Sequence, residues 1–383
     1  MSAFQFRTVP HLIVEGGAAA QLGAHIAHHF PSVRRALLVT DAGFLRTGLA
    51  AAPLHSLQAA GIEVHVFAEV QADPPEAIVL AGVAQAQMFH VELIIGLGGG
   101  SSLDVAKLIA VLAPGRQALA QLYGIGNVQG QRLPLVQLPT TAGTGSEVTH
   151  IAIVTTGATT KMGVVAPQLY ADLAILDASL TLGLPPAVTA ATGIDAMVHA
   201  IEAYTSRLLK NPLSDMLATQ ALSLLSSNLL TACRDGSNLP ARQAMLLGAM
   251  LAGQAFANAP VAAMALRLAM VSSSDSPLDA DDREISRLIT SADRRVAAIS
   301  NVVRVRVEFS KNRLNTLLPR SNGTFLTSRS LTPTKFPAVS RMCVRMALGK
   351  PSIDSRWISS PFLLSWGFRR YNTLEVSWKP LGN

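Results

Sequence analysis

Short runs of apolar residues alternate with longer helical patterns through the first half of the chain. The runs Arg35 to Thr40, Ile62 to Phe67 and Leu93 to Leu97 are rich in Val, Leu and Ile and have the length of strands. Helical patterns separate them, for example from Pro75 to Phe89. Strands and helices in this order build a parallel sheet. The pattern predicts a Rossmann-like α/β domain over residues 1–184.

The pattern changes near residue 185. Three helical stretches follow one another, Pro186 to Thr205, Pro212 to Cys233 and Pro240 to Ala257, with no strand-like run between them. We therefore predict that an all-helical domain follows the α/β N-terminal domain and begins over residues 185–264.

Beyond residue 264 the pattern loses coherence, and we find no sustained period of either kind. Residues 1–264 hold 12 Lys and Arg against 15 Asp and Glu, a net charge of −3; residues 265–383 hold 19 against 9, a net charge of +10. This basic, Ser- and Arg-rich tail has scattered charges with little aromatic interleaving, so we do not expect nucleic acid as a partner.

Composition narrows the class of protein. Apolar residues make up 49% of the chain and charged residues 14%, which indicates large buried cores. The first residues lack the charged stretch and apolar run of a secretory signal, so we expect a cytoplasmic protein. The uncharged run from Arg242 to Arg267 is interrupted by polar residues, which favours a buried helix over a membrane partner.

The strongest local motif is a glycine loop, Gly96 to Lys107, which directly follows a buried strand and opens a helix. Glycines allow a phosphate to approach the backbone closely, and the start of a helix turns unpaired N–H groups toward it. The loop predicts a pyrophosphate cradle. The alternative is a tight strand-to-helix turn with no ligand.

Three further features suit a dinucleotide. Asp41 ends an earlier strand, where its carboxylate would accept hydrogen bonds from ribose hydroxyls and repel a 2′-phosphate; the alternative is a helix cap. A second polar loop, Leu138 to Thr149, would contact a diphosphate or nicotinamide, or cap a helix that begins near Ser146. Lys161 is one of few positive charges in this part and would counter a cofactor phosphate.

Asp195 and His199 lie four residues apart in a predicted helix, on the same face. A carboxylate and an imidazole suit a divalent metal with oxygen and nitrogen ligands, and the pair is half of such a site. The alternative is an ordinary Asp–His interaction on a helix.

Together, the segments Gly98–Lys107, Pro139–Glu147 and Ala191–Tyr204 resemble the iron-containing alcohol dehydrogenase family, and the resemblance runs from about residue 6 to 263. It implies a dehydroquinate-synthase-like fold with NAD between an α/β domain and an all-helical metal-binding domain. Fe²⁺, or sometimes Zn²⁺, would bind there, with Asp195 and His199 as its first two ligands. The implied cofactor contacts are Asp41, Gly98, Gly99, Ser101, Asp104, Thr140, Thr141, Ser146, Thr149, Lys161 and Leu180. Small alcohols and aldehydes are the implied substrates, and a homodimer is the implied assembly.

The last third departs from this family. The family takes two further histidine ligands from a later stretch, whereas all nine histidines of this chain lie at or before His199. Our hypothesis is a shift of the reading frame near residue 264. We expect weak or no metal-dependent oxidation of a small alcohol. The alternatives are a catalytically inactive NAD-binding protein, a glycerol dehydrogenase or a maleylacetate reductase.

Overall fold

The computed structural model describes residues 3–157, 160–206 and 209–260 in full, and beyond them the backbone of three strands. Backbone contacts divide the chain into two units, Met1–Val296 and Ala297–Asn383. All predicted site residues lie in the first unit. The domain boundaries that we predict at residues 184 and 264 also fall inside this unit and stay predictions.

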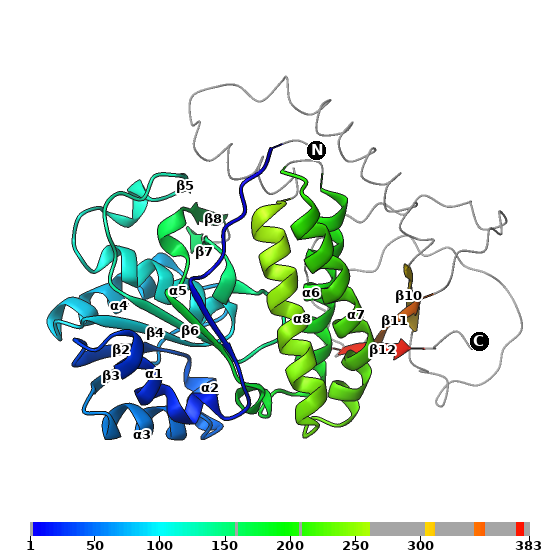
Figure 1. Ribbon diagram of the computed structural model, residues 1–383, viewed down its shortest axis with the longest axis horizontal. Helices are drawn as coiled ribbons and strands as arrows, with labels where there is room; N and C mark the ends of the chain where they lie inside the picture. Colours follow the sequence, from blue (N-terminus) through cyan, green and yellow to red (C-terminus); the bar gives the residue numbers. More distant parts are fainter. Residues whose placement is uncertain are drawn as a thin grey trace, which may run out of the picture. The chain divides into compact units, whose positions relative to one another are not determined.

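A six-stranded sheet forms the centre of the N-terminal lobe (Figure 1). Its strands are all parallel and lie in the order β1 (His11–Val14), β9 (Leu173–Leu176), β6 (Leu135–Pro139), β4 (Leu93–Gly98), β2 (Arg35–Val39) and β3 (Glu63–Phe67). The central strands β4, β6 and β9 are buried along their whole length, as expected of a sheet covered on both faces. The predicted Rossmann-like fold is confirmed.

Helices cover both faces of this sheet. They are α1 (Leu22–His29), α2 (Ala42–Arg46), α3 (Ala51–Ala59), α4 (Glu76–Met88) and α5 (Gly100–Leu112). Helix α1 packs beside α3 on one face and α4 beside α5 on the other (Figure 1). Leu22, Ile26 and Leu57 meet Leu38 and Ile95 in the core of the first face, where all five are fully buried.

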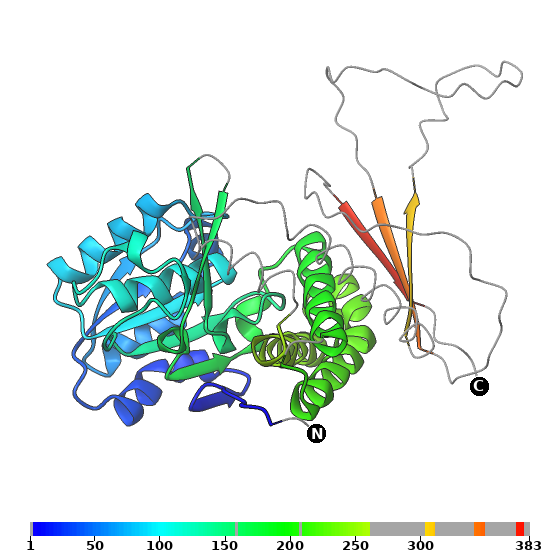
Figure 2. The same ribbon diagram turned by 90° about the horizontal axis from the view of Figure 1, so that it is seen from above.

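A small second sheet projects from this lobe (Figure 2). Its strands lie in the order β5 (Gly124–Ile125), β8 (Thr160–Val165) and β7 (Ile151–Thr156), and β7 and β8 form an antiparallel hairpin. Single helical turns join the elements: η1 (Ala18–Gln21), η2 (Leu119–Gln121), η3 (Ser146–Val148), η4 (Pro167–Leu169) and η5 (Ala178–Thr181).

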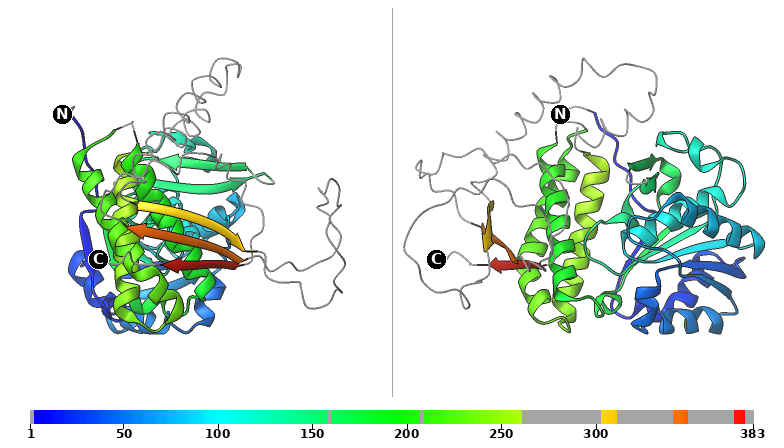
Figure 3. Two further views of the ribbon diagram at one scale, coloured as in Figure 1. Left: turned by 90° about the vertical axis from the view of Figure 1, so that its right-hand side faces the viewer. Right: turned by 180° about the vertical axis from the view of Figure 1, so that it is seen from behind.

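Three long helices build the second lobe, side by side in Figures 1 and 3: α6 (Pro186–Thr205), α7 (Pro212–Arg234) and α8 (Leu239–Asn258). Each has a proline in its first turn, as the sequence predicts. Among the described residues, α7 alone is long and apolar enough to cross a membrane, a test that core helices also pass. It packs against both α6 and α8, which is the arrangement of a core helix.

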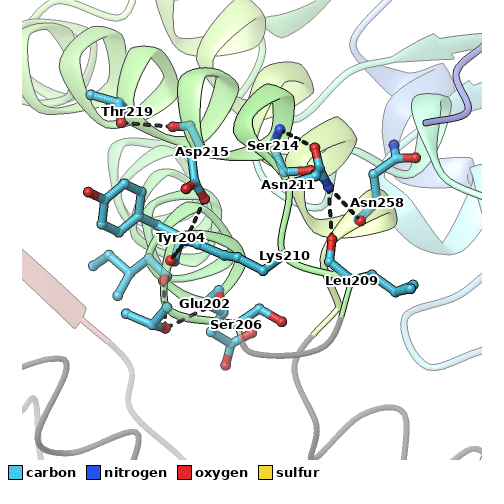
Figure 4. Close-up of polar contacts among 12 residues, drawn as sticks. Glu202, Tyr204, Ser206, Leu209, Lys210, Asn211, Ser214, Asp215, Thr219 and Asn258 are labelled. Atoms are coloured by element: carbon cyan, nitrogen blue, oxygen red, sulfur yellow. Dashed lines mark hydrogen bonds and ion pairs between the residues drawn. The ribbon is translucent and has the colours of Figure 1, made fainter. Parts of the chain in front are cut away.

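The junction between α6 and α7 is tied to the end of α8 (Figure 4). Asn211 caps α7 by accepting from the Ser214 N–H at 2.9 Å, and its amide donates to the Asn258 carbonyl at 3.1 Å. Lys210 pairs with Asp215 and lies over the Tyr204 ring, 4.5 Å from its centroid. These contacts fix the carboxyl end of α6.

The tail, in which we find no sustained period, contains three strands. Strands β10 (Val303–Ser310), β11 (Arg341–Leu348) and β12 (Thr373–Trp378) form a three-stranded sheet, antiparallel between β10 and β11 and parallel between β11 and β12 (Figure 3). The expectation of no sustained period is wrong at β10, where Val alternates with Arg over Val303–Val307. Such alternation is a strand pattern.

Candidate functional site

Three neighbouring strands end at one edge of the sheet, and each leads into a candidate segment. Strands β2, β4 and β6 lie side by side; Asp41 follows β2, the glycine loop follows β4 and the second loop follows β6. The Thr140 N–H donates to the Gly98 carbonyl at 2.9 Å and joins the two loops. Ligands of open α/β sheets bind at the carboxyl ends of the strands. The fold therefore brings together the candidate segments that are far apart in sequence.

The glycine loop forms an uncapped helix start. Helix α5 begins at Gly100, and because its N-cap is Gly99, no side chain pairs with its first N–H groups. A Cβ at Gly98 would lie 2.6 Å from the Ser102 side chain, and one at Gly100 would lie 2.8 Å from the Thr144 side chain. Ser101 lies in the first turn and is half-buried. Free N–H groups and the positive end of α5 fit a diphosphate.

Asp41 has two neighbours. Its Oδ1 accepts from the Phe44 N–H at 2.8 Å and caps α2, as the alternative interpretation requires. Its Oδ2 lies 3.7 Å from the position that a Cβ on Gly98 would take. One oxygen therefore caps a helix while the other lies beside the glycine loop, where a ribose hydroxyl would donate to it.

A helical element begins at Ser146, as the alternative interpretation expects, but it is only the single 3-10 turn η3, and β7 starts at Ile151. Its N-cap is Gly145, which has no side chain to cap it. The β-branched residues Val148, Thr149 and Ile151 favour a strand over a helix. The predicted contacts Thr140, Ser146 and Thr149 are all buried, and Thr141 is half-buried beside Gly99.

The sequence assigns no separate role to Lys107, the last residue of the glycine loop, which lies fully buried on α5 against the second loop. Its ammonium donates to Ser146 Oγ at 2.7 Å, Thr149 Oγ1 at 3.1 Å and the Ile151 carbonyl at 2.7 Å. The Asp104 carboxylate lies 3.5 Å away. Two features of the sequence could have indicated a buried, paired lysine here: Lys107 follows Asp104 by three residues, and the rest of its helix is largely apolar.

Burial dominates the electrostatics around this lysine. It lowers the pKa of Lys107, while the carboxylates of Asp104 and then Glu147 act in the opposite direction. Burial also raises the pKa of Glu147 to about 7 and lowers the pKa of His150 to about 4. The back of the second loop is therefore a buried region in which charged groups strongly affect one another's pKa.

Two predicted cofactor contacts have other partners. Lys161 forms an ion pair with Asp73 at 2.5 Å and donates to Thr155 Oγ1 at 2.8 Å, both outside the two loops. Leu180 lies in η5 and is buried in the main core cluster with Leu97 and Leu138. Their assignment to the cofactor stays a prediction.

Helix α6 carries the candidate metal ligands. Asp195 and His199 are both half-buried on one face of α6, and the His199 ring lies 5.1 Å from the Phe256 ring. His199 Nδ1 is buried and has no hydrogen-bond partner in the part of the chain that the structure describes. Burial raises the pKa of Glu202, with His199 opposing and Asp195 adding to the effect. Glu202 therefore shares this face, as its spacing of three from His199 could have predicted.

These residues do not fit the iron site that the family resemblance implies. Within residues 3–157, 160–206 and 209–260, no three His, Cys, Asp or Glu side chains converge to hold a metal ion. No histidine follows His199 in the sequence. Catalytic zinc and non-haem iron sites typically use three protein ligands, and the described residues offer two candidates.

Comparisons with known proteins agree with the fold. The sequence profile of "Iron-containing alcohol dehydrogenase" matches residues 10–178, and that of "Fe-containing alcohol dehydrogenase family, C-terminal" matches residues 189–269. The sulfoacetaldehyde reductase of Bilophila wadsworthia is 38% identical over 67% of this chain and 66% of its own length. The long-chain-alcohol dehydrogenase 1 of Geobacillus thermodenitrificans is 44% identical over 59% of this chain and 58% of its own length. The chain thus spans less than two thirds of these curated relatives.

Solved structures have a similar fold over about two thirds or more of this chain. A 1,3-propanediol oxidoreductase is 36% identical, with a TM-score of 0.65 and 72% of each chain covered. The first profile covers the Rossmann-like sheet with its glycine loop, and the second covers the helical lobe that carries Asp195 and His199. The chain belongs to the iron-containing alcohol dehydrogenase family.

Proposed function

We propose that the first unit binds NAD along the carboxyl edge of the sheet. Asp41 would hold the adenosine ribose, the glycine loop the diphosphate, and the second loop the nicotinamide half, because they follow the adjacent strands β2, β4 and β6 in that order. This order of three segments is the observation that carries the proposal. Helix α6 would complete the site beyond the nicotinamide.

The chemistry that we propose is hydride transfer between NAD and a small alcohol or aldehyde. The names of the relatives support it: one is a sulfoacetaldehyde reductase and another a 1,3-propanediol oxidoreductase. We expect weak turnover, because the described residues provide only Asp195 and His199 as candidates for the metal. Loss of a Lewis acid from such a site costs several kcal/mol, on the order of a thousandfold in rate.

The second candidate function is NAD binding without catalysis. The incomplete set of candidate ligands among the described residues favours it, because the three segments proposed to hold NAD precede Asp195 and His199 in the sequence. For either candidate we propose that the chain forms a homodimer and lies in the cytoplasm. Besides NAD, its only other partner would be a small alcohol or aldehyde.

One experiment separates the two candidates. NAD affinity, bound iron and zinc, and NAD-dependent oxidation of a short alcohol are measured on the full chain and on Asp195→Ala. Stoichiometric metal that the substitution removes, together with turnover, supports the enzyme. Bound NAD with neither metal nor turnover supports the binding protein. Failure to bind NAD contradicts both candidates.

A further inference from the structure

All three N–H donors of the Lys107 ammonium have acceptors inside the protein. An ammonium has three N–H donors, and each of the three has an acceptor between 2.7 and 3.1 Å. The side chain is fully buried, so a bound nucleotide would find no free donor on it. Any effect of Lys107 on a bound nucleotide must therefore pass through the segment that its three acceptors belong to.

All three acceptors belong to one short segment, Ser146 to Ile151, which leads out of the second loop into β7. The lysine itself stands on α5, the helix that the glycine loop opens. Asp104, one turn earlier on α5, accepts from Ser146 Oγ at 2.5 Å and from the Ile153 N–H at 3.0 Å. The two side chains thus fasten the second loop to the helix behind the glycine loop.

The opposite side of the second loop packs on the helical lobe without room for side chains. A Cβ on Gly143 would lie 2.8 Å from Thr192 of α6. One on Gly145 would lie 2.7 Å from the Gly253 Cα of α8. The loop is therefore held between α5 on one side and the helices α6 and α8 on the other.

We propose that Lys107 is a positioning residue that holds the second loop where it meets the nicotinamide half of NAD, without touching the cofactor. This inference rests on the proposed function. The other interpretation is that Lys107 only stabilises the fold. Positioning of one loop predicts a loss confined to the part of the ligand that the loop meets, whereas a general loss of stability weakens every part alike.

The test compares three nucleotide probes on the full chain by isothermal titration: AMP, ADP-ribose and NAD. AMP reaches Asp41 and the glycine loop, while NAD alone also extends to the second loop. Lys107→Met keeps the length of the side chain and removes its charge and donors. The matched control is Lys210→Met, which removes a partly exposed lysine of the helical lobe.

For Lys107→Met we expect the dissociation constant of AMP to change less than twofold and that of NAD to rise at least tenfold, so that the preference for NAD over AMP collapses. Lys210→Met should leave both constants unchanged. Equal weakening of all three probes, or an unchanged NAD affinity in a folded variant, overturns the inference.

Lys107→Gln covers the case in which Lys107→Met does not fold, because the neutral amide keeps two donors. In this variant the dissociation constant of NAD should rise about threefold to fivefold, with little change for AMP. An equal rise for AMP counts against positioning. If the unchanged protein binds AMP and NAD equally or not at all, the proposed NAD site is contradicted, and the inference falls with it. If it prefers NAD and the variants retain that preference, only the role of Lys107 fails.

Discussion

At the scale of single residues, Asp41 combines a local role with a proposed ligand contact. One oxygen caps α2 through the Phe44 N–H, and the other lies beside Gly98. Asparagine caps helices about as well as aspartate but carries no charge. The two roles can therefore be separated by substitution.

Asp41→Asn should keep the stability of the protein and relax its discrimination against NADP, because the repulsion of a 2′-phosphate is lost. We expect the ratio of NADP to NAD dissociation constants to fall roughly tenfold. Asp41→Ala should show the same change of preference and also lose about 1 kcal/mol of unfolding free energy with the cap. Titration with both dinucleotides and urea denaturation measure these effects. An unchanged preference in both variants would remove Asp41 from the ribose site.

Glu147 makes stability depend on pH. Burial raises its pKa from 4.5 to about 7, so the folded state holds this proton more tightly than the unfolded state. The stability that the proton provides is fully present below pH 4.5 and is lost as the pH rises to about 7. Glu147→Gln should therefore be more stable than the unchanged protein above pH 7, by at most about 3 kcal/mol, and equal to it below pH 4.5.

Denaturant unfolding of both proteins at several pH values measures the difference. His150, whose pKa is lowered to about 4, destabilises the fold as the pH falls, but it is present in both proteins and cancels. A difference that stays constant between pH 4.5 and 8 would refute the buried carboxylate.

At the scale of elements, the second loop depends on a glycine where it meets α8. Gly145 has a positive φ of 59°, and a Cβ there would lie 2.7 Å from the Gly253 Cα. Gly157 in the β7–β8 hairpin has nearly the same φ, 57°, with nothing within 4 Å of a Cβ. The two glycines differ only in their surroundings and form a matched pair.

Gly145→Ala should lower the unfolding free energy by about 3 kcal/mol and Gly157→Ala by about 1 kcal/mol. Both substitutions strain a left-handed backbone, but only the first also places a Cβ against α8. Thermal or urea unfolding compares them. Equal losses would mean that the loop can move away from α8 at no cost.

Much of the fold can be predicted from the sequence because its signals are local. The proline-led helices α6, α7 and α8 begin within a residue of their predicted starts, and β2 to β4 follow their apolar runs. The glycine loop and its position between strand and helix are also visible in the sequence. The prediction holds wherever the period of apolar residues agrees with the proline and glycine residues that mark the ends of elements.

The rest depends on contacts that no local pattern contains. Lys107 meets acceptors some forty positions away, Lys161 pairs with Asp73 in the loop before α4, and the helical turn that begins at Ser146 gives way to β7 at Ile151. A long polar or charged side chain shows its partner only after folding. The alternation of Val and Arg in β10 is different, because its period of two is a local signal that the sequence itself contains.

At the scale of the whole molecule, the question is where the family sequence stops. The C-terminal family profile extends to residue 269, slightly beyond the predicted change at 264. The net charge differs sharply on the two sides of this position, and histidine is absent after His199. These observations motivate the hypothesis of a shifted reading frame.

Sequencing of the coding DNA from independent clones tests it. We expect another frame, entered near codon 264, to encode a continuation that contains histidines. A protein made from that corrected frame should bind iron or zinc in stoichiometric amount. An uninterrupted frame in every clone, with no such continuation in the other frames, would show that the tail is natural.

The double attachment of the second loop has a consequence for the speed of binding. Many two-lobed enzymes close around their ligands, and this slow motion limits their rates. Here the loop is fastened to α5 by Lys107 and to α8 by backbone packing at Gly145, so closure at this seam would have to break both attachments. The second loop is therefore already in place before the nucleotide arrives, and nucleotide capture should follow a single fast phase that is set by diffusion and orientation rather than by an isomerisation of the protein.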